Sequence, residues 1–211
     1  MTKEYSISQA EILNHTRLKV EELFKKNPVA AHSYDHAERV SMHAVEIAKG
    51  EGSKSMFLAE LAGLLHDIGR VREEYHSKKN KLTHHELSYI MLQEWFNQDK
   101  MFESLTKEEK LTLLYAVRYH WNNMADDYEV AWILRDADKI DMFGEIGLER
   151  AREFCGGDSE KFHRDIRLKY DAFYWVHTKT AKAIVKERKL IEKVDIFYKK
   201  LLKDAIEPVV L

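Results

Sequence analysis

Apolar residues recur along most of this chain at the spacing of three or four that a helix with one buried face requires. The first such stretch follows Ser8–Glu11, which has the form of a capping box, and Asn27-Pro28 ends it. A second helix is predicted to begin near Asp35. The next, Met56 to Ile68, is apolar almost all round, so we expect it to cross the core, with Gly69 as its natural C′ residue.

Two further capping boxes mark helix starts in the middle of the chain. Thr83–Glu86 is predicted to open a helix that runs through Trp95. Thr106–Glu109 is predicted to open another, which reaches His120 and Trp121. The polar stretch between the core helix and the first of these boxes, residues 71–82, is predicted to be a loop or lid.

The rest of the chain is also helical in pattern. One helix is predicted over about 128–143, and Asp158 can cap a long helical segment that continues to about 205, with or without a bend. No segment shows the alternation of a strand, and no linker divides the chain. We therefore predict an all-α fold in one domain, residues 1–211, with the C-terminal helices of about 158–205 packed on the rest.

Charge and cysteine content narrow the function classes. The 34 basic and 36 acidic side chains give a net charge of −2, so the chain has no global basic field for nucleic acid, and the lysines between Lys179 and Lys203 are mixed with acids as on a solvated helical face. Cys155 is the only cysteine, which excludes an intramolecular disulfide and a cysteine-rich zinc site. No apolar run approaches the ~18 residues of a membrane span, so we expect a cytoplasmic protein with no membrane or stable nucleic-acid partner.

A histidine–aspartate pair supplies the strongest sign of chemistry. His66 and Asp67 end the most apolar helix, where burying two ionisable groups is costly unless a partner such as a divalent metal compensates. His36 lies on the inward stripe of its helix, with positions 40, 43, 44 and 47. Three acids, Asp136, Asp138 and Asp141, lie close together on a later helix, and only some of them can face the core.

These motifs together resemble the HD superfamily of metal-dependent phosphohydrolases. Tyr34–Val40 is similar to the first motif of that family, His66–Gly69 to the second, and Asp136–Asp141 to the last, whose middle acid is a ligand. The resemblance covers about residues 30–145. It implies an all-α HD-domain helical bundle, here with a long C-terminal helical extension, and a metal held by His36, His66, Asp67 and Asp138.

The same resemblance leaves the number of metal ions at one or two. Dinuclear members use two more histidines, for which His84 (or its neighbour His85) and His120 are the candidates, and Ser88 four residues after His84 fits the family pattern. Those members often carry a second histidine after the latter position, where this chain has Trp121. The alternative role for His84 and His120 is binding of the substrate phosphate. Nitrogen and oxygen ligands suit manganese, iron, nickel, cobalt or zinc, and magnesium is also compatible.

Cationic side chains near these motifs are candidates for phosphate binding. Arg39, Arg70 and Lys139 could each neutralise a phosphate, and Arg39 could equally pair with Asp35 or Asp138. His43 is predicted to be a packed or hydrogen-bonded neighbour and Cys155 an apolar filler. The remaining histidines are predicted at the surface or its boundary: His15, His32, His76, His85, His163 and His177.

The predicted reaction is hydrolysis of a phosphate mono- or diester, of a nucleotide or a related small molecule, with Asp67 both binding metal and orienting water. The main alternative is a di-iron oxygenase of the same superfamily that acts on a polyol or phosphonate. A nucleotide sensor and a helical adaptor are weaker readings, because the ligand set is intact. We expect specificity to reside in residues 71–82, 97–106 and 121–128. A homodimer is compatible with the size of the chain, although no heptad or apolar patch marks an interface.

Overall fold

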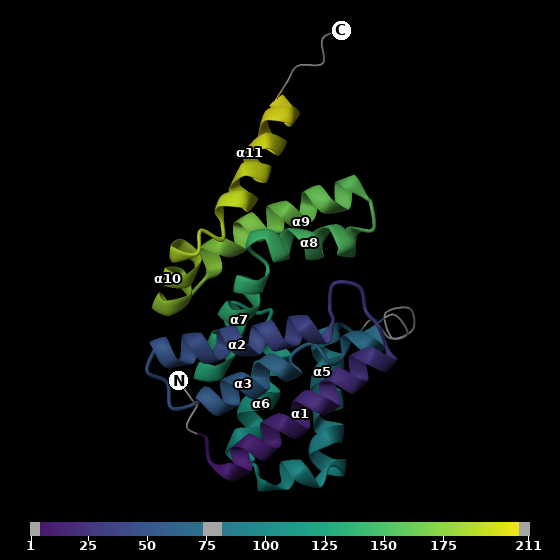
Figure 1. The fold of residues 1–211 in the computed structure, drawn as a ribbon, viewed down its shortest axis with the longest axis vertical. Coiled ribbons are helices and arrows are strands. Elements are labelled where there is room, and N and C mark those ends of the chain that lie inside the picture. The colour runs from purple at the N-terminus through teal and green to yellow at the C-terminus, as the bar shows by residue number, and fades with distance from the viewer. Residues whose placement is uncertain (1–4, 74–81, 207–211) are drawn as a thin grey trace.

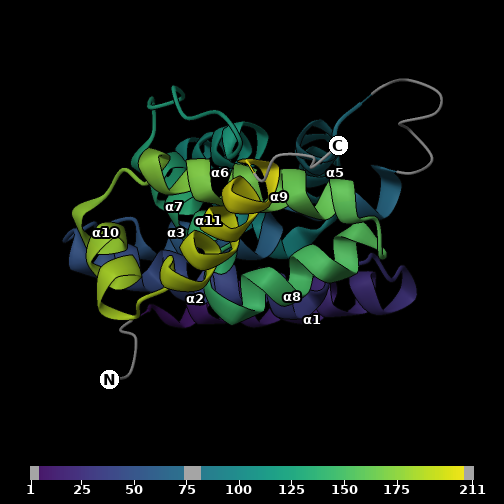
Figure 2. The ribbon, with the colours of Figure 1, turned by 90° about the horizontal axis from the view of Figure 1, so that it is seen from above.

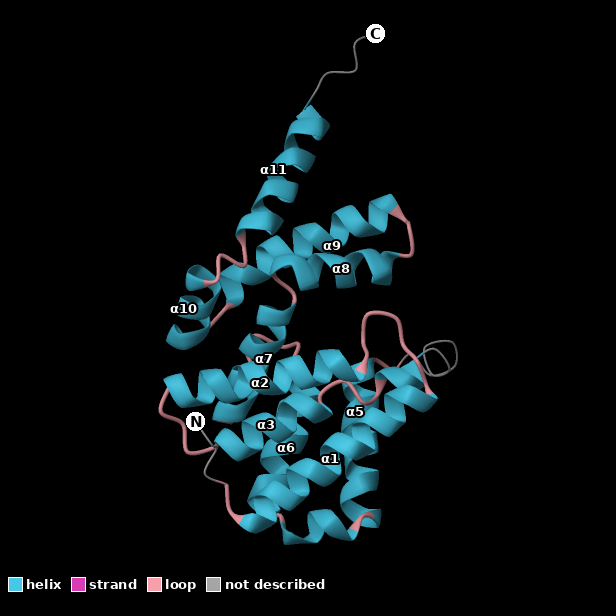
Figure 3. Cartoon of the chain, viewed as in Figure 1, coloured by secondary structure: helices cyan, strands magenta, loops and turns pink. Residues whose placement is uncertain are grey.

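The structure is a computed structural model, and it describes residues 5–73 and 82–206. These residues form helices, turns and loops without any strand, which confirms the predicted all-α class (Figure 3). The predicted loop 71–82 lies mostly outside the described residues, and its first part, residues 71–73, is helical. No described helix is both long enough and apolar enough to cross a membrane.

The larger part of the molecule is a bundle around one central helix (Figure 1). Helix α3 (Met56–Leu65) is buried over almost its whole length, as its apolar sequence predicts, and packs against α1, α2, α6 and α7. The surrounding elements are α1 (Ile7–Lys26), α2 (Tyr34–Gly50), α5 (His84–Gln98), η1 (Lys100–Ser104), α6 (Lys107–Tyr119) and α7 (Glu129–Asp141).

The C-terminal helices form a second layer over one side of this bundle (Figures 1 and 2). Its elements are α8 (Gly144–Cys155), α9 (Ser159–Ala172), η2 (Phe173–Trp175), α10 (Lys179–Glu187) and α11 (Glu192–Ile206). The predicted long segment 158–205 is therefore divided, at η2 and again after α10. Its start is confirmed, because the Asp158 side chain accepts from the Lys161 amide. Helix α8 was not predicted separately; Gly156, in the left-handed conformation, ends it.

Of the three predicted capping boxes, two are at the expected places. The boxes Thr83–Glu86 and Thr106–Glu109 cap α5 and α6 as expected. The first box was placed two residues too late: Ser6 accepts from the Gln9 amide, and the Gln9 side chain accepts from the Ser6 amide. Ser6 and Ser8 are each followed three residues later by Gln or Glu, so the capping-box pattern alone fits both positions.

Gly69 has a different role from the one predicted. Helix α3 ends at Leu65, and Gly69 does not adopt a positive φ, so it is not the left-handed C′ residue of that helix. A β-carbon at Gly69 would overlap the Ser88 amide nitrogen and the His84 carbonyl oxygen. Glycine is needed here because α5 lies directly against this turn, and the Gly69 amide donates to Ser88 Oγ at 2.8 Å. The pairing of Gly69 with Ser88 therefore fixes the start of α5 beside the end of α3.

Candidate metal centre

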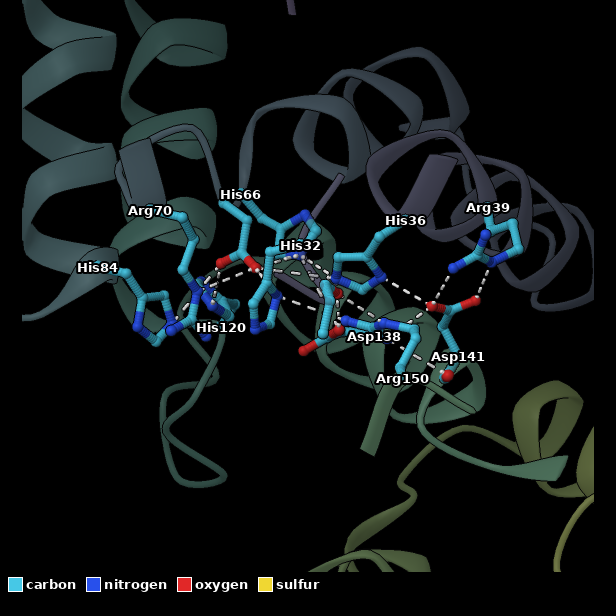
Figure 4. Close-up of polar contacts among 12 residues, drawn as sticks. His32, His36, Arg39, His66, Arg70, His84, His120, Asp138, Asp141 and Arg150 are labelled. Atoms are coloured by element: carbon cyan, nitrogen blue, oxygen red, sulfur yellow. Dashed lines mark hydrogen bonds and ion pairs between the residues drawn. The ribbon is translucent and has the colours of Figure 1, made fainter. Parts of the chain in front are cut away.

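The predicted ligands come together at a point where the ends of three helices meet the sides of two others (Figure 4). His66 directly follows α3, His120 directly follows α6, and His84 is the first residue of α5. The other predicted ligands are His36 on α2, Asp67 after α3 and Asp138 on α7. His36, His66, Asp67 and His120 are buried, which matches the apolar surroundings that the sequence predicts for the histidine–aspartate pair.

Hydrogen bonds fix three imidazoles in the form that binds metal. Nδ1 of His66 donates to the Gly63 carbonyl at 2.8 Å, and Nδ1 of His120 donates to the Val117 carbonyl at 2.7 Å. Nδ1 of His36 donates to Asp141 Oδ2, also at 2.7 Å. Because these partners only accept, each ring carries its proton on Nδ1 and presents the lone pair of Nε2 to the cluster.

Two further observations show that the cluster suits a cation. Nε2 of His36 and Nε2 of His66 lie 3.2 Å apart, although neither carries a proton to share in these tautomers. Asp67 Oδ1 is buried and accepts no hydrogen bond from the described residues. An uncompensated arrangement of this kind is costly, and a divalent cation between the facing lone pairs and the carboxylate removes the cost.

Asp67 lies between two groups of possible ligands. Its Oδ2 is 3.8 Å from His36 Nε2 and 3.7 Å from His66 Nε2, and Asp138 Oδ1 lies 3.5 Å from His36 Nε2. Its Oδ1 faces the other way, 3.6 Å from His84 Nε2 and 3.8 Å from His120 Nε2. We call His36, His66 and Asp138 the first triad, and Asp67, His84 and His120 the second triad. Asp67 thus directs one carboxylate oxygen toward each group of possible ligands.

The electrostatics favour the protonation states that bind metal. Burial lowers the pKa of His36 to about 4 and that of His120 to about 3, so both rings are neutral at neutral pH. Burial alone would raise the pKa of Asp67, but the nearby Arg70 and His66 outweigh it and hold that pKa well below its usual value. The pKa of Asp138 is lowered in the same way, since His66 and His36 outweigh burial. Neutral imidazoles and ionised carboxylates are the forms that bind divalent ions.

Comparison with known proteins agrees with this geometry. A family model described as HD domain matches residues 33–142, slightly more than half of the chain. The chain belongs to the HD domain family. The match contains both triads in full, and with the fold it supports a metal-dependent hydrolase in general.

Individual relatives match nearly the whole chain, in fold or in sequence. The structure of Bacillus subtilis YpgQ in complex with ADP has a TM-score of 0.68 at 21% identity and covers 97% of this chain and 100% of its own. A predicted HD superfamily hydrolase from an uncultured Thermotogales bacterium has a TM-score of 0.61 at 25% identity, covering 92% of this chain and 91% of its own. An uncharacterized protein of Acanthamoeba polyphaga mimivirus is 25% identical, over 91% of this chain and 83% of its own length. The likeness therefore includes the C-terminal layer beyond the HD domain match.

The three acids of α7 point in different directions, as the sequence predicts, and each contacts a different part of the structure. Asp136 accepts from the backbone of His177 and Thr178 at the start of α10. Asp138, the middle acid, faces His36 and His66. Asp141 accepts from His36 and from two arginines. Only Asp138 belongs to a triad, and its neighbours orient the surrounding structure.

The predicted cations have different surroundings. Arg39 donates through Nε to Asp141 Oδ1 at 2.6 Å, so its structural partner is neither Asp35 nor Asp138, and Figure 4 shows it on the far side of Asp141 from the triads. Arg70 donates to Asp67 Oδ2 at 3.3 Å and to Glu73 at 2.9 Å. Nζ of Lys139 donates to Asn123 Oδ1 at 2.8 Å and to the Trp175 carbonyl.

A cavity of about 740 Å³ opens over the triads. On the HD domain side it is lined by Asp67, His84, His120 and Asp138, beside the cations Arg70 and Lys139. On the opposite side α8, α9 and η2 provide a wall of both apolar and charged side chains: Arg150, Ala151, Phe154, Asp165, Leu168, Lys169, Asp171, Ala172 and Trp175. Arg39 does not line this cavity. The cavity thus joins the charged residues of the triads to a wall that carries aromatic side chains.

Two residues near the triads were not predicted there. His32 was placed at the surface or its boundary, but its Nδ1 lies 3.1 Å from Asp67 Oδ2. Arg150 on α8 contacts Asp141 and lines the same cavity. His32 precedes α2, so the periodicity of that helix could not place it, and Arg150 lies outside every motif. By contrast, His85 stacks on Trp121, and it is His84, the candidate that the sequence favours, whose ring faces Asp67.

Proposed function

We propose that this protein is a metal-dependent phosphohydrolase that cleaves a phosphate mono- or diester of a nucleotide or related small molecule. The observation that carries the proposal is that Asp67, His84, His120 and Asp138 line the same cavity as several cations. Arg70, Lys139 and Arg150 are among these cations. Hydrolysis of a phosphate ester needs a nucleophile and neutralisation of charge on the phosphate, and this arrangement provides a place for both.

Different residues of this chain would bind the metal and the phosphate. The first triad and Asp67 would hold one ion, and Asp67, His84 and His120 a second. When bound, a divalent metal would lower the pKa of a water and polarise a phosphoryl oxygen. Arg70, held against Asp67 and Glu73, and Lys139, held by Asn123, would bind phosphate oxygens. Asp67, which lines the cavity, would also orient the attacking water.

The second triad favours a second ion over direct phosphate binding by His84 and His120. Both Nε2 atoms face the same buried oxygen, Asp67 Oδ1, which has no hydrogen-bond donor among the described residues. A phosphate placed between these two histidines would meet that carboxylate and be repelled by it. Imidazole and carboxylate ligands suit manganese, iron, nickel, cobalt or zinc, with magnesium also compatible.

The cavity wall supports a nucleotide as the substrate. Trp121, Phe154 and Trp175 line the cavity and are exposed, so an aromatic base could stack there while the phosphates reach the triads. A volume of about 740 Å³ lies within the usual range for small-molecule sites. YpgQ of Bacillus subtilis, which shares the fold, was crystallised with ADP.

The test is phosphate release from a panel of nucleotides and small phosphoesters, with manganese, iron, nickel, cobalt or magnesium added. We compare the wild type with Asp67→Ala and with Asp195→Ala, whose carboxylate lies on α11 and pairs with Lys199. Asp67→Ala should lower the rate by about a thousandfold or more, because the metal supplies several kcal/mol of transition-state stabilisation. Asp195→Ala should retain the wild-type rate.

A di-iron oxygenase is the second candidate, because the two triads together would also hold two irons. Wild-type protein that is folded and metal-loaded but releases phosphate from nothing in the panel would contradict the hydrolase. Bound iron together with oxygen uptake on a polyol or phosphonate would then favour the oxygenase.

A further inference from the structure

The side chain of Arg150 connects three separate parts of the structure. Its Nη1 donates to Asp141 Oδ2 at 2.7 Å, its Nε donates to the Ala31 carbonyl at 2.9 Å, and its Nη2 lies 3.4 Å from His32 Nδ1. The side chain is only 14% exposed. Arg150 belongs to α8, so it lies outside the HD domain match of residues 33–142.

The contact with Asp141 links Arg150 to the first triad. Asp141 Oδ2 accepts the Nδ1 proton of His36, and this bond holds the His36 ring with Nε2 toward the cluster. Arg150 donates to the same oxygen. Without Arg150 this oxygen would keep only the longer arginine bond, from Arg39 Nη2 at 3.1 Å, and the orientation of the His36 ring would loosen.

The contact with Ala31 links Arg150 to a second imidazole. Ala31 has a φ of 61°, in the left-handed region, which is unfavourable for a residue with a β-carbon. This conformation closes a short turn in which the His32 amide donates to the Val29 carbonyl, and it directs His32 toward Asp67 Oδ2. The donation from Arg150 Nε to the Ala31 carbonyl stabilises the turn in that conformation.

We propose that Arg150 is a positioning residue of the metal centre. Through Asp141 it holds His36, and through Ala31 it holds His32 against Asp67, so that both imidazoles face the same carboxylate oxygen. The inference rests on the proposed metal centre and not on the substrate. The proposal also makes the C-terminal layer part of the metal centre. Among the described residues of that layer, Arg150 is the only one that contacts both Asp141 and Ala31.

Arg39 provides a matched comparison. Both arginines donate to Asp141, and Arg39 makes two of its hydrogen bonds. Arg39 lies on α2 and contacts neither the Ala31 carbonyl nor His32 among the bonds of the described residues. An arginine that only neutralises Asp141 should therefore behave like Arg39, whereas a positioning residue should affect the centre more.

The experiment is a cobalt titration of metal-free protein, followed by the visible absorption of bound Co²⁺, in the wild type, Arg150→Met and Arg39→Met. We expect Arg150→Met to bind the first cobalt about 10- to 100-fold more weakly, with a changed absorption spectrum, as for other residues that orient metal ligands. Arg39→Met should show the smaller loss and a spectrum close to that of the wild type. Thermal unfolding of each metal-free variant identifies any that does not fold.

Wild-type affinity and spectrum in Arg150→Met, or equal changes in the two variants, would overturn the proposal. If Arg150→Met does not fold, Arg150→Lys and Arg39→Lys replace the pair. Lysine keeps the charge but cannot reach all three acceptors, so Arg150→Lys should still bind cobalt more weakly than Arg39→Lys, and equality would again count against the assignment. The readout needs no substrate, so it stays interpretable if the protein releases no phosphate from any compound.

Discussion

The HD domain segment and the C-terminal layer contribute differently to the same cavity. The segment 33–142 supplies all members of both triads, carried on helices packed around the buried α3. The layer from α8 to α11 supplies the opposite wall, and in α9 only Ile166 and Lys169 are buried. Metal ligands need fixed positions, which a dense core provides. A wall of partly exposed helices can differ in side chains without disturbing the ligands, so we infer that it selects the substrate.

The largest expected effect is the loss of metal from the core segment. His66→Ala removes a buried ligand of the first triad and should abolish nearly all stable metal binding. His84→Ala removes a ligand of the second triad and should reduce the bound metal from two equivalents to one. Mass spectrometry of the metal content after dialysis checks both results.

His85→Ala is the matched control for this comparison, since His85 neighbours His84 but stacks on Trp121. It should retain the wild-type metal content. A wild type that binds one equivalent, unchanged in His84→Ala, would show that the second triad is not a metal site.

The core segment was also the part that the sequence described best. His36, His66 and Asp138 lie on or next to strongly patterned helices, and the resemblance to the ordered motifs of the HD superfamily placed them together. His32 and Arg150 could not be found in this way. One depends on a left-handed backbone at Ala31 and the other on how α8 docks, and both are tertiary features without a local signal.

The second expected effect concerns two acids of α7, of which one should mainly stabilise the fold and the other mainly bind metal. Asp136 is fully buried and accepts from the amides of His177 and Thr178 at 3.0 and 2.6 Å, so it fastens the start of α10 to α7. Asp136→Asn removes the charge from these bonds and should lower the free energy of unfolding by about 1.5–3 kcal/mol. Urea unfolding of the metal-free protein measures this change.

Asp138→Asn, two residues further along α7, tests the acid that we expect to bind metal. Burial and the Asp67 carboxylate raise the pKa of Asp138, but His66 and His36 outweigh them, so the ionised side chain stabilises the folded metal-free protein. The Asp138 side chain is 25% exposed, so Asp138→Asn should lower the free energy of unfolding by less than Asp136→Asn does. It should bind metal more weakly, while Asp136→Asn should not. If Asp138→Asn destabilises the metal-free protein as much as Asp136→Asn does, the division between an anchoring and a binding acid is wrong.

The smallest expected effect concerns the wall and its selection of substrate. The Trp175 side chain lines the cavity, whereas that of its neighbour Tyr174 does not, and both are more than half exposed. Stacking on an aromatic side chain is worth about 1–3 kcal/mol per base, so Trp175→Leu should raise KM for the best nucleotide roughly tenfold and leave kcat nearly unchanged. Tyr174→Leu should change neither value. Steady-state kinetics should also show no rise in KM for ribose 5-phosphate, which has no base to stack; an equal rise for that compound would mean that Trp175 shapes the cavity as a whole and does not select the base.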